Sequence, residues 1–281
     1  MAIQPGSPGE VGGIEPPIPP PGVPRRGRSR RPGLAATLIV VGVLGLAAAG
    51  FGISQQFLPR RFTNAQRQRI EAWEVGQRWR TTPKARLFPA KVHYDLVGQQ
   101  IGVPGSLKLL ARRLGIAKQA PCARAAGGGK KLASLFTRDG CQTVLRATYT
   151  DSTSSLVLTV GVAVLHNEEK ATSAVKYLTG NTATSDGATS DHVLLRPVSV
   201  PGTPAAAFGS KQRQLAWVVG SGSYLVMATA GYADGRPAVP VASDSYAYLE
   251  MTSLARGVAV DIALPLGVPP PVPHCPGGPG C

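Results

Sequence analysis

The stretch 142–180, QTVLRATYTDSTSSLVLTVGVAVLHNEEKATSAVKYLTG, combines two β-type patterns with one helical pattern. The runs 142–150 and 156–165 are rich in Val, Leu and Thr and flank a polar turn, as two paired strands do. Asn167 then precedes two glutamates, which the positive end of a helix dipole favours in the first turn. The apolar positions that follow have helical spacing: Ala171, Ala174, Val175 and Leu178. The stretch therefore predicts a strand–strand–helix unit.

A second stretch farther along the chain has the same order of patterns. The runs 213–219 and 224–230 flank the small residues 220–223, which are typical of a hairpin turn. Ser243 or Asp244 is placed to open a second helix. The apolar stripe of this helix is Met251, Leu254, Ala255, Val258 and Ile262. The duplicated strand–strand–helix unit predicts an α+β fold, in which an antiparallel sheet carries two helices on one face.

The segment before these two units predicts a helix, an edge strand and a further short helix. Residues 62–80 are helical, because Thr63 and Gln66 have the spacing of a capping box. Residues 86–97 alternate imperfectly, and the proline among them restricts a strand to the edge of a sheet. Residues 106–115 combine a serine cap, leucines three and four positions apart and a final glycine, a pattern that predicts a helix.

The most apolar part of the chain is 34–53, LAATLIVVGVLGLAAAGFGI, which contains no charged residue. Twenty residues in a helix span about 30 Å, the hydrocarbon thickness of a bilayer. A cleaved signal peptide has a shorter apolar run before its small-residue site, and a buried soluble helix has a polar face. The stretch therefore predicts a single transmembrane helix that acts as a signal-anchor.

The cysteines predict on which side of the membrane the domain lies. Five arginines precede the apolar stretch and four follow it closely, so the positive-inside rule decides little. The cysteines all lie in the large domain: Cys122, Cys141, Cys275 and Cys281. An even number of cysteines on one side favours disulfides in an oxidising compartment. We therefore expect a single-pass protein of the cell membrane with a cytoplasmic N-terminus and an extracytoplasmic C-terminal domain.

Four cysteines allow three disulfide pairings, and we expect the sequential one, Cys122 with Cys141 and Cys275 with Cys281. The first pair encloses a loop whose closure contributes on the order of 3 kcal/mol to stability. The alternative is a metal site with His274 beside Cys275, but this spacing fits no zinc pattern. We expect no metal site and no cofactor.

The charge of the chain is unevenly distributed. The net charge is +15, and residues 54–146 hold +14 of it, with 18 Lys and Arg against four Asp and Glu. The predicted basic membrane-proximal surface consists of Arg60, Arg61, Arg67, Arg69, Arg78 and Arg80. Such a surface attracts anionic lipid or cell-wall polymers, although a solvated face without a partner has the same composition. Nucleic acid is disfavoured, because the basic residues are not interleaved with aromatic residues.

The sequence contains no recognisable catalytic set. No Gly-x-Ser-x-Gly elbow occurs, and the glycine-rich stretches lack the spacing of phosphate-binding loops. Among the histidines only His93, in a predicted strand beside Tyr94 and Asp95, is worth testing as a base. A surface histidine without a catalytic role is the simpler interpretation, so we predict no catalytic residue.

Three segments resemble parts of uncharacterised single-pass membrane proteins of actinobacteria: 230–236 (AGYADGR), 200–204 (VPGTP) and 275–281 (CPGGPGC). The resemblance covers nearly the whole chain after residue 33, in segment order and composition. It implies a location in the cell envelope and transfers no active-site residues. By fold pattern alone, the domain is also similar to extracytoplasmic sensor-like α+β domains of the same bacteria.

These features divide the chain into parts. Residues 1–33 are a disordered Pro- and Arg-rich cytoplasmic tail, 34–53 the transmembrane helix, 54–83 a membrane-proximal helix, 84–264 the extracytoplasmic α+β domain and 265–281 a Pro/Gly-rich tail with a cysteine pair. We expect a non-catalytic role in the cell envelope, in which the domain binds a ligand, a partner protein or cell-wall material. The alternatives are an extracytoplasmic hydrolase with scattered catalytic residues and an accessory subunit of a larger membrane complex.

Overall fold

The computed structural model describes residues 63–97, 105–127, 130–180, 186–188, 195–239 and 245–271, which belong to one compact unit, Phe62–Cys281. No helix in these ranges is both long enough and apolar enough to cross a bilayer. The predicted tail, 1–33, and the predicted transmembrane stretch, 34–53, lie outside the described residues. Four predicted site residues also lie outside them: Arg60, Arg61, Cys275 and Cys281.

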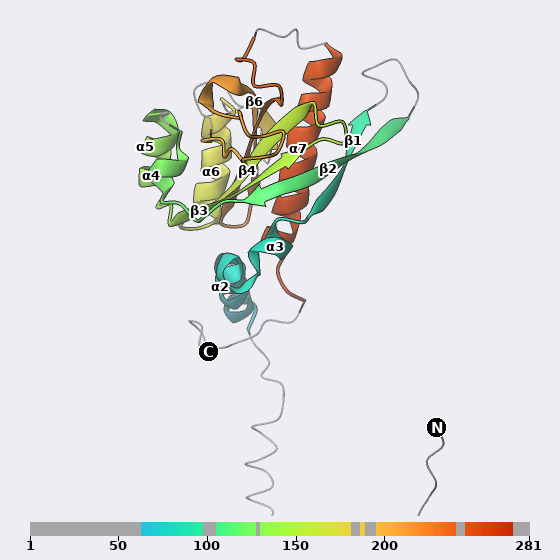
Figure 1. Ribbon diagram of the computed structural model, residues 1–281. Coiled ribbons are helices and arrows are strands. Elements are labelled where there is room, and N and C mark those ends of the chain that lie inside the picture. The colour runs from blue at the N-terminus through green and yellow to red at the C-terminus, as the bar shows by residue number, and fades with distance from the viewer. Residues whose placement is uncertain are drawn as a thin grey trace, which may run out of the picture. The chain divides into compact units, whose positions relative to one another are not determined.

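A single antiparallel sheet forms the centre of the fold (Figure 1). Its strands are β1 (Lys91–Val97), β2 (Ser106–Ile116), β3 (Thr143–Thr150), β4 (Leu156–Val164), β5 (Asp186–Ala188), β6 (Arg213–Ser221) and β7 (Tyr224–Tyr232). They are ordered β1-β2-β3-β4-β7-β6-β5, and neighbouring strands are antiparallel. The predicted α+β class and the antiparallel sheet are confirmed.

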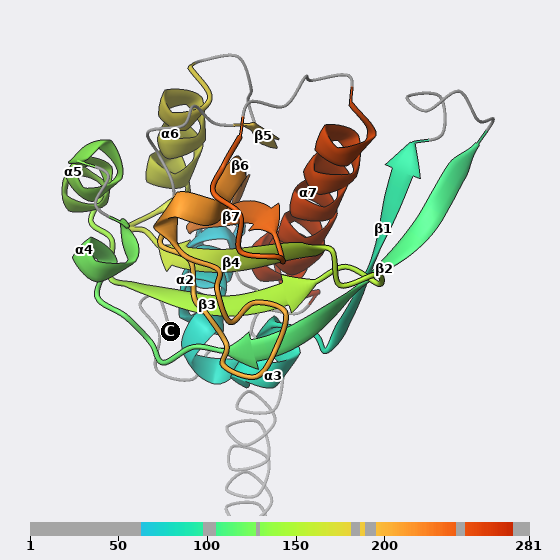
Figure 2. The same cartoon turned by 45° about the horizontal axis from the view of Figure 1, so that its top comes forward.

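Six α-helices lie in the described residues: α2 (Asn64–Thr81), α3 (Lys84–Leu87), α4 (Cys122–Ala125), α5 (Lys130–Arg138), α6 (Glu168–Leu178) and α7 (Tyr246–Gly267). Four of these helices lie on two sides of the sheet, and α2 and α3 lie at its lower end in Figure 1. One side holds α4, α5 and α6, whereas α7 lies beside the β1–β2 hairpin on the other side (Figure 2). The apolar stripes predicted for α6 and α7 are buried in full, so both long helices are confirmed.

Side-chain caps set the starts of three helices. Thr63 and Gln66 form the predicted capping box of α2, in which each side chain bonds the backbone N–H of the other residue. Asn167 caps α6 as predicted, accepting a hydrogen bond from the backbone N–H three residues later at 2.9 Å. The cap of α7 is Ser245, so this helix begins slightly later than predicted.

The helices α6 and α7 cover opposite faces of the sheet. Val162 of β4 and Val226 of β7 belong to the core that contains α7, whereas their neighbours Ala163 and Met227 belong to the core that contains α6. Successive side chains of a strand point to opposite faces. The prediction that both helices share one face is therefore wrong.

The physical reason lies in the burial of the central strands. Every residue of β3 and β4 is buried. The sequence of β4, LVLTVGVAV, is nearly continuously apolar, as is usual for a strand covered on both faces, and such a sequence does not show which face each helix covers. The two strand–strand–helix units consequently do not repeat the same packing.

The short helix predicted for 106–115 is also wrong, because these residues form β2. β2 pairs along its first part with β1, with Val97 opposite Ser106 and Lys91 opposite Arg112. The leucine spacing fits a helix, but the pairing with β1 and β3 overrides this local preference. The predicted strand 86–97 is confirmed in part, because β1 covers Lys91–Val97 at an edge of the sheet as expected, whereas Arg86 and Leu87 belong to α3.

A tyrosine hydroxyl fastens α2 to the sheet. Tyr224, at the start of β7, is fully buried, and its hydroxyl accepts a hydrogen bond from the N–H of Trp79 at 3.2 Å and donates one to the carbonyl of Val75. These backbone groups are four residues apart, the pair that a regular α-helix joins directly. Burial raises the pKa of Tyr224 to about 12, so the hydroxyl keeps the proton that it donates.

Replacing this hydroxyl tests how α2 is held. Tyr224→Phe leaves two backbone groups of α2 without this partner, so we expect the free energy of unfolding in urea to fall by about 1–3 kcal/mol. Hydrogen exchange of the amides around Trp79 should become faster. Tyr177→Phe, at an exposed tyrosine of α6, is the matched control and should change neither measurement. Unchanged exchange in the Tyr224 variant would contradict the role of the hydroxyl.

Candidate functional site

Four arginines of the predicted basic surface lie in the described residues, and their contacts differ. Arg67 and Arg69 are exposed on α2. Arg78 instead donates from Nη1 to two carbonyl oxygens in the last turn of α7, one of them at 2.9 Å, and so stabilises that helix end. The guanidinium of Arg80 lies 4.8 Å from the ring centroid of the preceding tryptophan. One terminal nitrogen of Arg78 is thus bonded within the fold, which fixes the position of this guanidinium.

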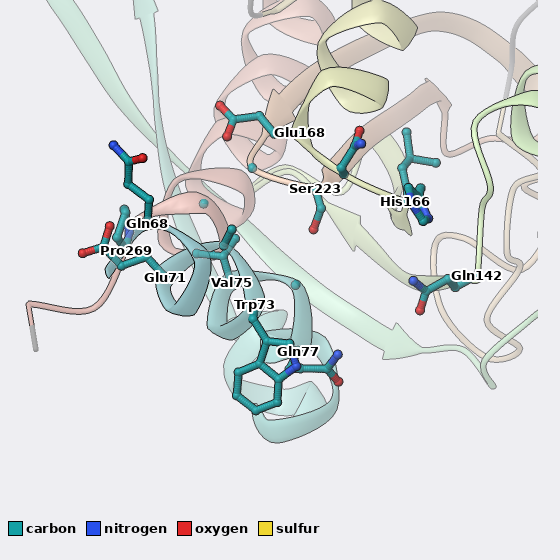
Figure 3. A pocket seen from close by; sticks show the side chains of 16 residues that line it. Gln68, Glu71, Trp73, Val75, Gln77, Gln142, His166, Glu168, Ser223 and Pro269 are labelled. Carbon is teal, nitrogen blue, oxygen red and sulfur yellow. The ribbon is translucent and has the colours of Figure 1, made fainter. Parts of the chain in front are cut away.

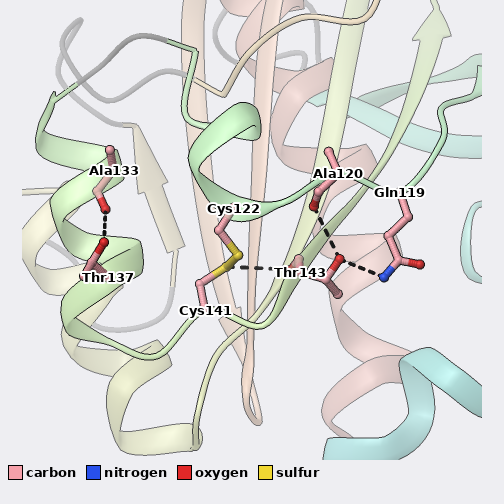
Figure 4. The surroundings of a disulfide bond; sticks show 7 residues. All are labelled: Gln119, Ala120, Cys122, Ala133, Thr137, Cys141 and Thr143. Atoms are coloured by element: carbon pink, nitrogen blue, oxygen red, sulfur yellow. Dashed lines mark hydrogen bonds between the residues drawn. A yellow bond between two sulfur atoms is a disulfide. The ribbon is translucent and has the colours of Figure 1, made fainter.

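The predicted disulfide Cys122–Cys141 is present and joins α4 to the residues just before β3 (Figure 4). The chain that enters α4 is also bonded to β3. The hydroxyl of Thr143 accepts a hydrogen bond from Nε2 of Gln119 at 2.9 Å and donates one to the carbonyl of Ala120 at 3.4 Å. The disulfide and these bonds together hold α4 against the sheet.

A cavity of about 530 Å³ lies between α2 and the rest of the domain (Figure 3). Its walls come from α2, the β4–α6 connection, the β6–β7 turn and the end of α7, and they include Trp73, His166 and Ser223. In the described part of the chain, the buried hydroxyl of Ser223 has no hydrogen-bond partner, and no hydrogen bond joins it to His166. The cavity therefore lacks a serine paired with a base.

A second cavity, of about 420 Å³, runs along α7, and we call it the α7 groove. His93, Tyr94 and Asp95 of β1 line one part of it and Trp217 of β6 another. The remaining lining residues belong to α7 and recur every three or four positions between Thr252 and Leu264. They alternate with the buried stripe of the helix, so the groove follows the side of α7 next to that stripe, where Val260 packs against the margin of the core.

Three polar atoms of residues that line the α7 groove are buried without a hydrogen-bond partner in the described ranges. They are Oη of Tyr94, Nε1 of Trp217 and Oγ1 of Thr252. An unpaired buried polar group costs about 1–3 kcal/mol, and for this reason nearly all such groups in proteins are paired. All three atoms are shielded from solvent, and they belong to residues of β1, β6 and α7 that line the groove, which makes it the candidate site for a polar ligand.

The groups around the α7 groove differ in charge. Burial, and then the charges of Glu250 and Asp151, raise the pKa of the Tyr94 hydroxyl well above its usual range, so this group is a neutral donor at physiological pH. Burial also raises the pKa of Asp261, and the nearby His93 opposes that shift. The groove thus combines neutral hydroxyl and N–H groups with ionisable side chains.

His93, the histidine that the sequence offered for testing, lies in the α7 groove with Ser253 and Asp261. His93 and Asp261 are exposed, and within the described residues no hydrogen bond joins His93 to either side chain. A serine nucleophile requires a base within hydrogen-bond distance. No group of three or more His, Cys, Asp or Glu side chains in the described ranges is placed to hold a metal ion.

Sequence reasoning did not identify Trp217 and Thr252 as site residues. Gly257 could have indicated this site. A glycine inside a helix lowers the stability of the helix by about 1 kcal/mol relative to alanine, so it usually marks a place where another element packs closely. A Cβ at position 257 would lie 2.3 Å from Cβ of Tyr94. The glycine therefore allows β1 to approach α7, and this approach forms one side of the groove.

No protein-family model matches this chain, and neither a curated protein nor a solved structure is significantly similar to it. The resemblance to membrane proteins of actinobacteria therefore stays a prediction. The case for a functional site rests on the geometry of the α7 groove.

Removing the unpaired hydroxyl of Thr252 is expected not to lower the stability of the protein, unlike most substitutions of buried residues. Thr252→Val keeps the shape of the side chain and removes the buried oxygen, so we expect the ligand-free protein to be equally stable or up to about 1 kcal/mol more stable. Thr148→Val is the control, because the Thr148 hydroxyl donates to the carbonyl of Val198 at 2.7 Å. That variant should lose about 1 kcal/mol or more in urea unfolding. Equal losses in both variants would show that the Thr252 hydroxyl is paired.

Proposed function

We propose that this protein is an extracytoplasmic binding domain that the apolar stretch 34–53 tethers to the cell membrane. The disulfide Cys122–Cys141 supports an oxidising compartment. The length of the apolar stretch matches a bilayer, and the arginines close to its N-terminal end favour a cytoplasmic tail. The resemblance to single-pass membrane proteins of actinobacteria has the same implication.

Thiol labelling in intact cells tests this topology. In a variant with Cys122→Ala and Cys141→Ala, a membrane-impermeant maleimide applied after mild reduction is expected to label Cys275 or Cys281 in the full chain. As the control, Ser7→Cys in a chain without other cysteines should be labelled only after the membrane is opened. Labelling of the C-terminal cysteines that requires broken membranes would contradict the proposed orientation.

We propose further that the α7 groove binds a polyhydroxylated ligand, a cell-wall glycan, without changing it chemically. The unpaired atoms of Tyr94, Trp217 and Thr252 carry this proposal. A sugar hydroxyl both donates and accepts, so one class of ligand can pair with a phenol, an indole N–H and a threonine hydroxyl. Trp217 also supplies an aromatic ring, and Asp261 adds a carboxylate that accepts hydrogen bonds from sugar hydroxyls.

Calorimetric titration of the full chain in neutral detergent tests the glycan site. The probe is a tetrasaccharide of N-acetylglucosamine, a defined substitute for the peptidoglycan backbone. Thr252→Val should weaken its binding about tenfold, because the complex loses one buried hydrogen bond. Ser173→Ala, at an exposed position of α6, should bind as the unmodified chain does. Equal affinities in all three proteins would overturn the assignment of the groove.

One observation favours a second candidate, an extracytoplasmic hydrolase. His93 and Asp261 are close enough in the α7 groove for the charge of His93 to affect the pKa of Asp261. The same tetrasaccharide mixtures, analysed by mass spectrometry after incubation, distinguish the two functions. Intact tetrasaccharide supports binding alone, whereas cleavage that is lost in His93→Gln would support the hydrolase.

A further inference from the structure

Arg146 of β3 is a buried arginine without a carboxylate partner. Only 8% of the residue is exposed. Its Nη1 donates to the carbonyl of Arg196 at 3.2 Å, and its buried Nε has no partner in the described part of the chain. None of the ion pairs among the described residues includes it. Buried charges in proteins are normally paired, because removing them from water is costly.

Two further arginines lie around Arg146. Arg124 belongs to α4, and Arg196 belongs to the segment 195–200; both side chains are exposed. The N–H of Arg196 donates to the carbonyl of Ala125 at 2.8 Å, so this segment is bonded directly beside α4. Burial lowers the pKa of Arg146, and the charges of Arg196 and Arg124 lower it further. Three cations are therefore gathered at one place without a described carboxylate among them.

The fold holds this arrangement in place against the repulsion of like charges. Gly161 of β4 pairs with Arg146, and a Cβ there would lie 2.6 Å from the side chain of Leu195. The segment 195–200 therefore packs directly on the strand. Val198 in the same segment accepts a hydrogen bond from the hydroxyl of Thr148 at 2.7 Å and donates one to that of Thr159 at 3.0 Å. The three arginines are thus positioned by packing and by hydrogen bonds.

We propose that Arg124, Arg146 and Arg196 form a binding site for a phosphate group, which we call the arginine site. The planar guanidinium presents parallel N–H groups that match phosphate oxygens, and charge-assisted bonds of this kind are strong. Arg146 supplies a buried donor, and the two exposed arginines supply the remaining positive charge. The core around Arg146 lies on the face of the sheet opposite to α7, so this site does not depend on the proposed function of the α7 groove.

Titration with a soluble phosphate ester tests the arginine site. The probe is glycerol 1-phosphate, added to the full chain in neutral detergent and followed by calorimetry at constant ionic strength. Arg146→Met keeps the apolar part of the side chain and removes the cation, and it should weaken binding at least about tenfold. Arg112→Met removes the same charge from an exposed position of β2, outside the predicted basic surface, and should bind as the unmodified chain does.

A second arm identifies the source of the phosphate. Micelles doped with dioctanoyl phosphatidylglycerol present the same group as a lipid headgroup. Binding of the lipid but not of glycerol 1-phosphate, lost in Arg146→Met, supports the site with a lipid as its ligand. Binding of glycerol 1-phosphate that is lost in the same variant supports a soluble ester or polymer.

Variants of the two exposed arginines, and the stability of the Arg146 variant, give further tests of the arginine site. If Arg146→Met does not fold, Arg124→Gln and Arg196→Gln replace exposed side chains and should each weaken binding by about threefold or more. Where Arg146→Met folds, it should be no less stable than the unmodified chain without ligand. Binding to neither probe, or equal binding by the Arg146 and Arg112 variants, would overturn the arginine site.

Discussion

Burial of the central strands on both faces is the constraint on which the other positions in this fold depend. An antiparallel sheet commonly leaves one face to solvent, but here every residue of β3 and β4 is covered. The helix α7 covers one face, and α4, α5 and α6 cover the other. Where the second face carries polar side chains, the segment 195–200 supplies their partners, as Val198 does for Thr148 and Thr159. The described segment 195–200 therefore lies over this face of the sheet.

The sequence correctly predicted elements that are buried on one side, because their apolar residues recur with a regular spacing. The stripe of α7 from Met251 to Ile262 and the cap of α6 at Asn167 are local features, and both were predicted. The face that each helix covers was not predictable, because a strand such as β4, which is apolar on both sides, shows no alternation of polar and apolar residues. β2 was mistaken for a helix, because the spacing of its leucines fits a helix and only the pairing with β1 decides the outcome.

The candidate site was less predictable than the fold. Trp217 and Thr252 are far apart in the sequence, and only the packing of α7 against the sheet brings them to one cavity. His93 was recognised from its strand, but the sequence did not show that Asp261 would lie near it. The arginine site was not predicted from the sequence for a related reason, since Arg124, Arg146 and Arg196 come from three separate segments. In both places the informative feature is a buried polar atom without a partner, which a sequence does not display.

The contact between Gly257 and Tyr94 has a consequence for the width of the α7 groove. Gly257 acts as a spacer of minimal thickness between α7 and β1, because even a methyl group there would meet the tyrosine. β1 is an edge strand, and the sheet bonds it on one side only, to β2. A bulkier residue at 257 would separate β1 from α7 and disturb Val92 and Tyr94, which belong to the same core as the buried stripe of α7. The spacing between helix and edge strand, and with it the width of the groove at this point, therefore depends on the absence of a single side chain.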